Sequence, residues 1–404
     1  MDRQPVIGSS YGVETYRGQH AARCEFSSPR PITGCRLPYN RRMEIRAGTL
    51  TALYLFDVSE SIDLTGVRDA LGAGSEARLA PKTPTPAYVQ YQVPPLVIEG
   101  ETIGVPGIAG LSARFKFFDY GVVSLALSRP FSGEWADIVR FGQEYIENAA
   151  LEAGAEESVR QIVTRCGSRL SRLRRAWLSE DYLVVVVHDM AGQPDADALI
   201  AERGSDIAQF VRGEVQALSR QEQEEVLSAR LSYLANDVVV PTWNAAFVYD
   251  TEAGGAAALE LFEFANSQLL EFRYYDALLD AELGRIYPAL QRTSWWGNLV
   301  GGRATRAANE LHSLFIDVND ITDRTENALK IVGDIYAARV LALVGRRLGV
   351  ERWKQSVEEK LKTLDDIYRF VVEQVSISRG QFLEIVVVVI LIMELIPIFL
   401  DMMH

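Results

Sequence analysis

Cysteine, histidine and lysine are scarce in this chain of 404 residues. It has three cysteines and four histidines, and only six of its 41 basic residues are lysines. Cys24, Cys35 and Cys166 are odd in number and widely spaced, without a CxxC pair. This pattern argues against a disulfide framework and a structural zinc site, and it fits a reducing compartment. Two of the histidines lie in terminal segments, so few remain that could form a histidine-based active site.

The chain also lacks a surplus of positive charge. Its formal net charge of -13 argues against a body that coats nucleic acid, because such domains are usually basic. A hydrophobic content of 48% with 24% charged residues is typical of a globular protein, and the length suits roughly two domains. Residues 1–47 contain no apolar h-region, so no secretory signal peptide is predicted. We interpret them as an arm without fixed structure, with a transit peptide or a start at Met43 as alternatives.

Sequence motifs for common catalytic sites are missing. We find no GxxxxGK[ST], no GxGxxG between a strand and a helix, no GxSxG and no HExxH. His188 ends an apolar run and is interpreted as a strand-end residue. The acidic residues of the later helical region lack the Glu-x-x-His pairs of a di-metal bundle site, and we interpret them as a solvated face. They are Glu260, Glu263, Glu271, Asp276 and Asp280. The sequence therefore assigns no catalytic, cofactor-binding or metal-binding residue.

Apolar periodicity predicts an α+β domain over residues 48–250. The expected elements are a strand over 49–58, a helix over 61–71, strands over 87–98 and 114–127, a helix over 132–177 and a strand over 181–188. This β-α-β-β-α-β order is that of the ferredoxin-like unit. A further helix over 219–234 and a strand over 238–249 are expected to follow.

After residue 250 the pattern becomes helical. One long helix is expected over 252–290, and two more over 305–347 and 352–378 carry apolar seams of roughly heptad spacing. We expect an antiparallel, coiled-coil-like helical hairpin within a helical domain over 251–378. Because the seams are longer than a hairpin needs, they predict self-association as a homo-oligomer.

The last apolar run predicts a transmembrane helix over 381–400. Residues 382–400 are apolar except for Glu384 and Glu394, and as a helix they span roughly 28 Å, the thickness of a bilayer core. The residues expected to mark the anchor are Arg379, Phe382, Glu384, Ile385, Glu394 and Leu400. A buried helix in an oligomer core is the alternative.

The charges that flank this run favour a body on the cytoplasmic or matrix side. Arg369 and Arg379 precede it, whereas Asp401 and His404 follow it. The expected location is the bacterial inner membrane, or the mitochondrial inner membrane in a eukaryote.

A cluster of arginines is the most uneven charge run. Arg165, Arg169, Arg172, Arg174 and Arg175 lie within TRCGSRLSRLRRAW. On a helix the first three share a face, while Leu170, Leu173 and Trp177 point inward. Such a face can contact RNA phosphates or anionic lipid headgroups. The alternative is a solvated basic face that pairs with the surplus acids of the chain.

Two segments, FKFFDYGVVSLAL at 115–127 and SRGQFLEIVVVVILIMELI near the C-terminus, resemble the "required for meiotic nuclear division" family. The second resembles the closing pattern of that family through Arg379, Leu383, Glu384 and Glu394. The resemblance implies a membrane protein without established catalytic activity and with a link to organelle translation. We therefore expect a membrane-anchored, self-associating, non-enzymatic scaffold. A membrane-tethered RNA- or ribosome-associated factor is the alternative, and an enzyme of unknown reaction the third.

Overall fold

The computed structural model describes residues 43–72, 89–100, 103–105, 108–291, 315–316, 318, 329–331 and 334–402. All of them belong to one compact unit that spans residues 40–404. The predicted N-terminal arm lies outside the described residues up to position 42. Strand β1 (Ile45–Asp57) begins within its last residues.

A mixed sheet forms the centre of the unit. Its strand order is β10-β11-β9-β1-β7-β6-β4, and β5 also pairs with β6. Besides β1, the sheet contains β4 (Leu96–Glu99), β5 (Ile103–Val105), β6 (Ile108–Phe117), β7 (Val122–Gly133), β9 (Leu178–Met190), β10 (Val238–Pro241) and β11 (Ala245–Tyr249). Neighbours are antiparallel except β9 and β11, which are parallel. The α+β class predicted from the sequence is confirmed.

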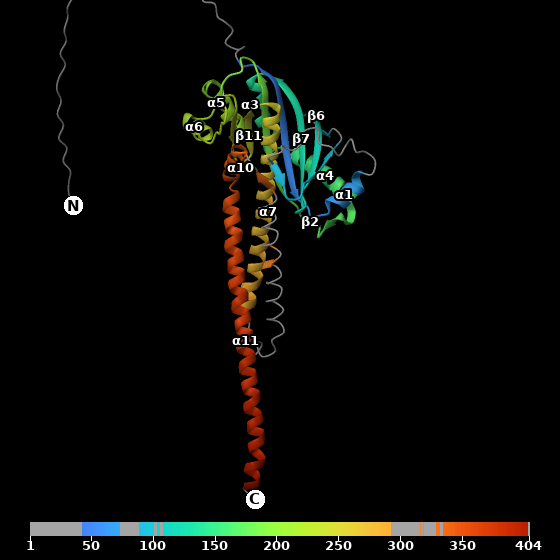
Figure 1. Cartoon of the computed structure of the whole chain (residues 1–404), viewed down its shortest axis with the longest axis vertical. Helices are drawn as coiled ribbons and strands as arrows, with labels where there is room; N and C mark the ends of the chain where they lie inside the picture. The colour runs from blue at the N-terminus through green and yellow to red at the C-terminus, as the bar shows by residue number, and fades with distance from the viewer. Residues whose placement is uncertain are drawn as a thin grey trace, which may run out of the picture. The chain divides into compact units, whose positions relative to one another are not determined.

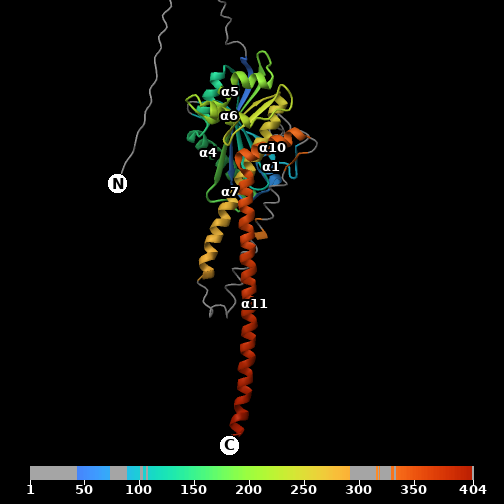
Figure 2. The same cartoon turned by 90° about the vertical axis from the view of Figure 1, so that its left-hand side faces the viewer.

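Helices cover both faces of this sheet, as Figure 1 shows and Figure 2 shows from the side. One face packs against α1 (Leu64–Gly72), α3 (Trp135–Tyr145), α4 (Ala149–Cys166), α5 (Ala196–Arg212) and α6 (Arg220–Ser228). The other packs against α7 (Glu252–Gln291) and α10 (Ile335–Leu348). Side chains alternate along β1, so that Leu50 and Ala52 join the first core while Leu53 and Leu55 join the second. Burial on both faces explains the continuous apolar runs of the central strands.

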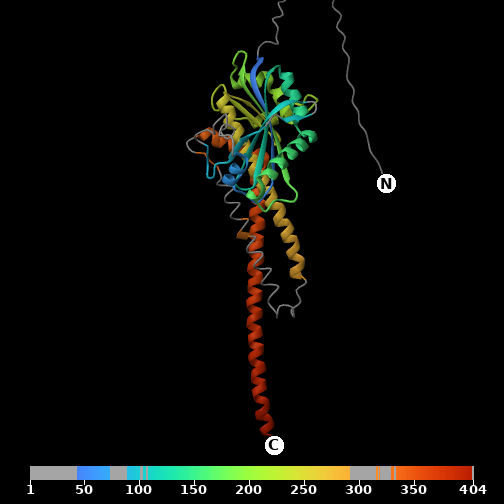
Figure 3. The ribbon, with the colours of Figure 1, turned by 90° about the vertical axis from the view of Figure 1, so that its right-hand side faces the viewer.

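Helix α7 changes its packing partner along its length. Up to Leu270 it packs on the sheet, whereas from Phe272 it packs on α11 (Val350–Met402). Asp276 contacts Ser356 and Lys360, and Lys360 also pairs with Asp280, so the two helices run parallel. Figure 3 shows them leaving the sheet together. We call α7 after Leu270, together with α11, the stalk, and the rest of the described unit the body.

Several predicted boundaries are wrong, for local reasons. The strand predicted over 114–127 is the hairpin of β6 and β7, because Gly121 adopts a φ of 102° in the turn between them. The helix predicted over 132–177 is divided where the Asn148 side chain accepts hydrogen bonds from the amides of Ala150 and Leu151 and starts α4. Gly167, with a φ of 60°, then ends α4.

Two further predicted segments, 87–98 and 305–347, also differ from the structure. The range 87–98 contains β3 (Val89–Tyr91), which pairs with β12 (Leu329–Ile331) away from the central sheet. Since β12 lies inside the range 305–347, that range is not one helix. Its described helical part in the body is α10, which ends at Gly349 with a φ of 73°.

The predicted anchor residues fall mostly outside the described side chains. Among the side chains that are described, no helix is long and apolar enough to cross a membrane. The backbone of α11 runs through residues 381–400, and Glu384 is exposed on it. Arg379, Phe382, Ile385, Glu394 and Leu400 have side chains outside the described set.

Candidate functional site

The sheet-facing side of α7 carries a row of buried polar residues. Glu260, Glu263, Ser267 and Glu271 are spaced three or four apart and therefore share one face. Glu263 and Glu271 are 0% exposed and Glu260 is 8% exposed, so the solvated face predicted from the sequence is wrong for them. Asp276 is also 8% exposed, and of the five predicted residues Asp280 alone is exposed.

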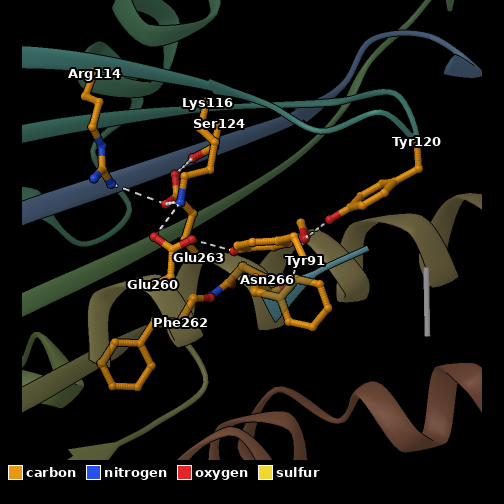
Figure 4. A network of polar contacts seen from close by, with 11 residues as sticks. Tyr91, Arg114, Lys116, Tyr120, Ser124, Glu260, Phe262, Glu263 and Asn266 are labelled. Carbon is orange, nitrogen blue, oxygen red and sulfur yellow. Dashed lines mark hydrogen bonds and ion pairs between the residues drawn. The ribbon is translucent and has the colours of Figure 1, made fainter. Parts of the chain in front are cut away.

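Strand β6 supplies the positive charge for the first part of this row. Lys116 Nζ lies 2.8 Å from Glu260 Oε2 and also contacts Glu263 Oε2. Arg114 Nη2 lies 3.2 Å from the same Glu263 oxygen, and Figure 4 shows both cations pointing at α7. The other oxygens are occupied as well, because Ser124 donates to Glu263 and the Tyr91 hydroxyl donates to Glu260. We call this set the Lys116 network.

The charges in the Lys116 network balance. Burial raises the pKa of Glu263, but Lys116 and Arg114, with the hydrogen bonds from Lys116 and Ser124, bring that pKa below its usual value. Burial, and then Glu260, raise the pKa of Tyr91 well above its usual value. Every carboxylate oxygen of the pair has a hydrogen-bond donor, so the network fixes the position of α7 on the sheet. It has the features of a structural clamp.

The sequence contains a signal for this network. In Arg114-Phe115-Lys116-Phe117 the two cations alternate with aromatic residues, which places both cations on one face of a strand. The missing information was that this face lies under α7. Within the described ranges, no group of three or more His, Cys, Asp or Glu residues is arranged to hold a metal ion.

A second buried cluster lies further along α7. Arg174 Nε lies 3.2 Å from each carboxylate oxygen of Asp57, and the Arg174 guanidinium stacks 3.6 Å from the ring centroid of Tyr274. Burial raises the pKa of Asp57 to about 6, against the opposing effect of Arg174. Glu271 completes the cluster, and burial followed by the charge of Asp57 raises its pKa well above the usual value. Here the acids outnumber the cation.

Arg165, Arg169 and Arg172, which the sequence predicts on one helix face, do not lie on one helix. Arg165 lies at the exposed end of α4, whereas Arg169, Arg172, Arg174 and Arg175 follow the break at Gly167, in the short helix η2 (Gly167–Arg169) and the connection to β9. Arg172 pairs with Glu60 at 2.8 Å, and Arg169 lies 4.0 Å from Asp63.

The side chains predicted to pack inward from this segment divide as well. Leu170 is buried, Trp177 is half-buried, and Leu173 is 53% exposed, contrary to the prediction. Arg165, Arg169, Arg172 and Arg175 are exposed, and acids lie near two of them, so contact with phosphate or lipid stays a prediction for these four. The Arg174 side chain is not available for such a contact, because it lies inside the second cluster.

Two substitutions distinguish the buried Arg174 from the exposed Arg172. Arg174→Gln is expected to lower the free energy of unfolding by about 2 kcal/mol, because it leaves the buried Asp57 carboxylate without its ionic partner. Arg172→Gln is expected to change it by less than about 0.5 kcal/mol, because its pair with Glu60 is largely exposed. Chemical denaturation of both variants measures the difference, and equal effects would contradict the assignment.

His188 lies near the end of β9, and its Nε2 is 2.9 Å from Thr49 Oγ1. Burial lowers its pKa, against the opposing charges of Glu252 and Asp250. This arrangement is compatible with the structural role predicted from the sequence.

The similarity to known proteins covers the part of the body that precedes α7 and stops in the first turn of that helix. Residues 47–256 match the family described as "Uncharacterized protein MJ0711, N-terminal domain". Uncharacterized protein MJ0711 from Methanocaldococcus jannaschii is 23% identical over 202 residues, which are 50% of this chain and 61% of that protein. No solved structure matches the chain.

This match overturns the resemblance to the "required for meiotic nuclear division" family. FKFFDYGVVSLAL lies inside the matched range and forms the β6–β7 hairpin. Its apolar residues are those that any doubly buried hairpin with a glycine turn requires, so the motif was not specific. Asp57, Lys116 and Arg174 lie within the match, whereas Glu263 and Glu271 lie beyond it. Since the matched range covers more than half of its length, the chain belongs to the family of the uncharacterized protein MJ0711 N-terminal domain.

Proposed function

We propose that this protein is a membrane-anchored, self-associating interaction protein without enzymatic activity, with α11 as its anchor. One observation carries the proposal. The seven consecutive residues from Val387 to Met393 are all apolar, and each is between 48% and 67% exposed. Successive helix residues point about 100° apart, so this segment is apolar and uncovered on every side.

Such a surface needs a cover that surrounds the helix. A helix that is hydrophobic all round is stable inside a protein core or a bilayer. Residues 382–400 have the length of a bilayer core, as noted above, which favours lipid as the cover. The arginines before the segment favour a cytoplasmic body.

The stalk sets the distance between the body and the membrane in this proposal. Lys360 contacts Asp276 and Asp280 where α11 runs beside α7. From there to Phe382 the helix rises roughly 33 Å. Arg174, which stacks on Tyr274, lies near the upper end of this distance. The exposed arginines around it are therefore too far from the lipid headgroups, and a protein or RNA partner suits them better.

We also propose that the body contains a ferredoxin-like unit. Four strands, in the order β9-β1-β7-β6, are antiparallel to their neighbours. In chain order, β1 is followed by α1, then, after the short strands β3, β4 and β5, by the β6–β7 hairpin, then by α3 and α4, and then by β9. Without the short strands this is the β-α-β-β-α-β order of that unit. The sheet is extended by β4 and β5 beside β6 and by β11 and β10 beside β9.

Deleting residues 381–404 tests the anchor. The truncated chain is expected to move from the carbonate-washed membrane pellet to the soluble fraction, because it loses the uncovered apolar segment. A matched control reverses the order of residues 387–393 and keeps their composition. It should stay in the pellet, since a bilayer selects for hydrophobicity and length rather than for specific packing. Recovery of the truncated chain in the pellet would contradict the proposed anchor.

The mass in detergent tests self-association. We expect an oligomer of the full-length chain, and comparison with a chain that ends at Ser378 locates the contact. A monomer in both cases would defeat this part of the proposal. Loss of bound partners from solubilised membranes after nuclease treatment would instead support the RNA- or ribosome-associated function.

A further inference from the structure

Glu271 occupies the point where α7 passes from the body to the stalk. Leu270, on its N-terminal side, packs in the core formed with the sheet, and Phe272, on the other side, packs in the core formed with α11. Glu271 itself is 0% exposed. Any change in the charge of this carboxyl group therefore acts on the joint between the two parts of the protein.

The groups around Glu271 come from four parts of the chain. Asp57 ends β1, Asp119 and Tyr120 lie in the β6–β7 turn, Arg174 lies in the connection to β9, and Tyr274 and Tyr275 follow on α7. The carboxyl groups of Asp57 and Glu271 therefore both act on the one guanidinium, and the charge of Asp119 also acts on Glu271. Arg174 is already engaged, with its Nε on both oxygens of Asp57 and its Nη1 on the Tyr274 hydroxyl at 2.7 Å.

Glu271 has few of the contacts that a buried carboxylate needs. Among the described residues, neither of its oxygens has a hydrogen bond of good geometry. The buried hydroxyl of Tyr275, one turn further on, is close enough to lower the pKa of Glu271, but burial and the charge of Asp57 outweigh it. An ionised carboxylate in such a place is strongly disfavoured. The Lys116 network shows the contrast on the same helix, since every oxygen of Glu260 and Glu263 there has a donor.

We propose that Glu271 and Asp57 form a proton-binding site at the joint between body and stalk, and that loss of its proton loosens α7 from β1 and from the Arg174 segment. A proton suits the site better than a metal ion, because the guanidinium of Arg174 repels a second cation. The proton neutralises one carboxyl group without requiring more ligands. This inference is independent of the membrane anchor, since the site lies in the body and the upper stalk.

The direction of the pH dependence follows from the environment. Burial, and then the charge of Asp57, raise the pKa of Glu271 in the folded protein above its value in the unfolded chain, while Arg174 and the hydroxyl of Tyr275 act in the opposite direction. The folded state therefore holds a proton that the unfolded state has released. The contribution of Glu271 to stability is most favourable below the unfolded-state pKa and declines as the pH rises towards the folded-state pKa.

The test compares the full-length protein with Glu271→Gln, which has the shape of the protonated acid and cannot ionise. The melting temperature of the wild type is expected to fall relative to the variant between about pH 5 and about pH 9. Glu202→Gln removes an exposed acid on α5 and should follow the wild type. Amide hydrogen exchange in α7 around Glu271, corrected for intrinsic rates, should accelerate at high pH in the wild type and not in Glu271→Gln.

Infrared spectroscopy gives a readout that does not depend on folding of the variant. At about pH 7 the ordinary carboxyl groups are ionised, so a protonated-carboxyl band in the wild type reports a perturbed acid. We expect this band, and its loss in Glu271→Gln. Its absence from the wild type would overturn the proposal, as would parallel melting profiles of the wild type and the variant. Stabilisation of the wild type alone by sodium, potassium or magnesium would replace the proton with a metal ion and would also overturn it.

Discussion

Lys116→Met is expected to lower the free energy of unfolding by about 3–5 kcal/mol, the largest effect that we predict for a single side chain. Lys116 is 1% exposed and contacts both Glu260 and Glu263. Methionine has a similar volume and removes the ammonium group, so the variant leaves two buried carboxylates with Arg114 as their remaining cation. The loss therefore comes from uncompensated charge rather than from a cavity.

Two further variants test whether uncompensated charge causes this loss. Lys362→Met removes an exposed lysine on α11 and should change the free energy of unfolding by less than about 0.5 kcal/mol. Glu263→Gln in the Lys116→Met background should recover part of the loss, because it removes one uncompensated charge. Denaturant titration measures all three. A loss for Lys116→Met no greater than that for Lys362→Met would show that the network does not hold α7 on the sheet.

Gly121→Ala is expected to destabilise the protein by about 2–4 kcal/mol, the second of the large effects. Gly121 lies in the turn between β6 and β7 with a φ of 102°, which side chains rarely adopt. A Cβ atom there would lie 1.9 Å from the carbonyl oxygen of Ser59, which is backbone and cannot rotate away. The Gly121 carbonyl also accepts a hydrogen bond from Val58, so movement of the turn disturbs the end of β1.

Gly284→Ala, on α7, is expected to have the opposite effect on stability. A Cβ atom at Gly284 meets no atom within 4 Å, and the residue lies inside a helix. Alanine should therefore stabilise the protein by up to about 1 kcal/mol through helix propensity. Thermal or chemical unfolding of the two variants measures the contrast. A neutral Gly121→Ala would mean that the turn relaxes more easily than the contact with Ser59 implies.

The sequence predicted the class of the fold and many of its elements correctly. The apolar runs around Leu53 and Val185 gave strands β1 and β9, and the period of about 3.6 residues after Asp250 gave α7. Local signals also mark most of the boundaries that we missed. The Gly121 turn, the Asn148 cap and the Gly167 cap depend on backbone conformation at single residues, which an average over an apolar window does not detect.

The candidate site could not be predicted in the same way. On the sequence, Glu260, Glu263 and Glu271 look like the polar side of an amphipathic helix, because their neighbours three and four residues away are the only contacts that the sequence defines. Lys116 lies 147 residues before Glu263, and Arg174 lies 117 residues after Asp57. Which acid meets which cation depends on how β6 and the connection to β9 are placed under α7.

The sequence by itself determined the local properties of this protein. Strand and helix type, the scarcity of catalytic motifs and the apolar stretch at the end of α11 all follow from the order of residues along one segment. The tertiary structure alone decided which polar residues are buried and whether their charges are balanced. The reason is physical: the energy of a charge depends on its exposure to water and on the distance to its partners in space. Packing of α7 on the sheet sets both quantities, giving a balanced network at Lys116 and an acid-rich one at Glu271.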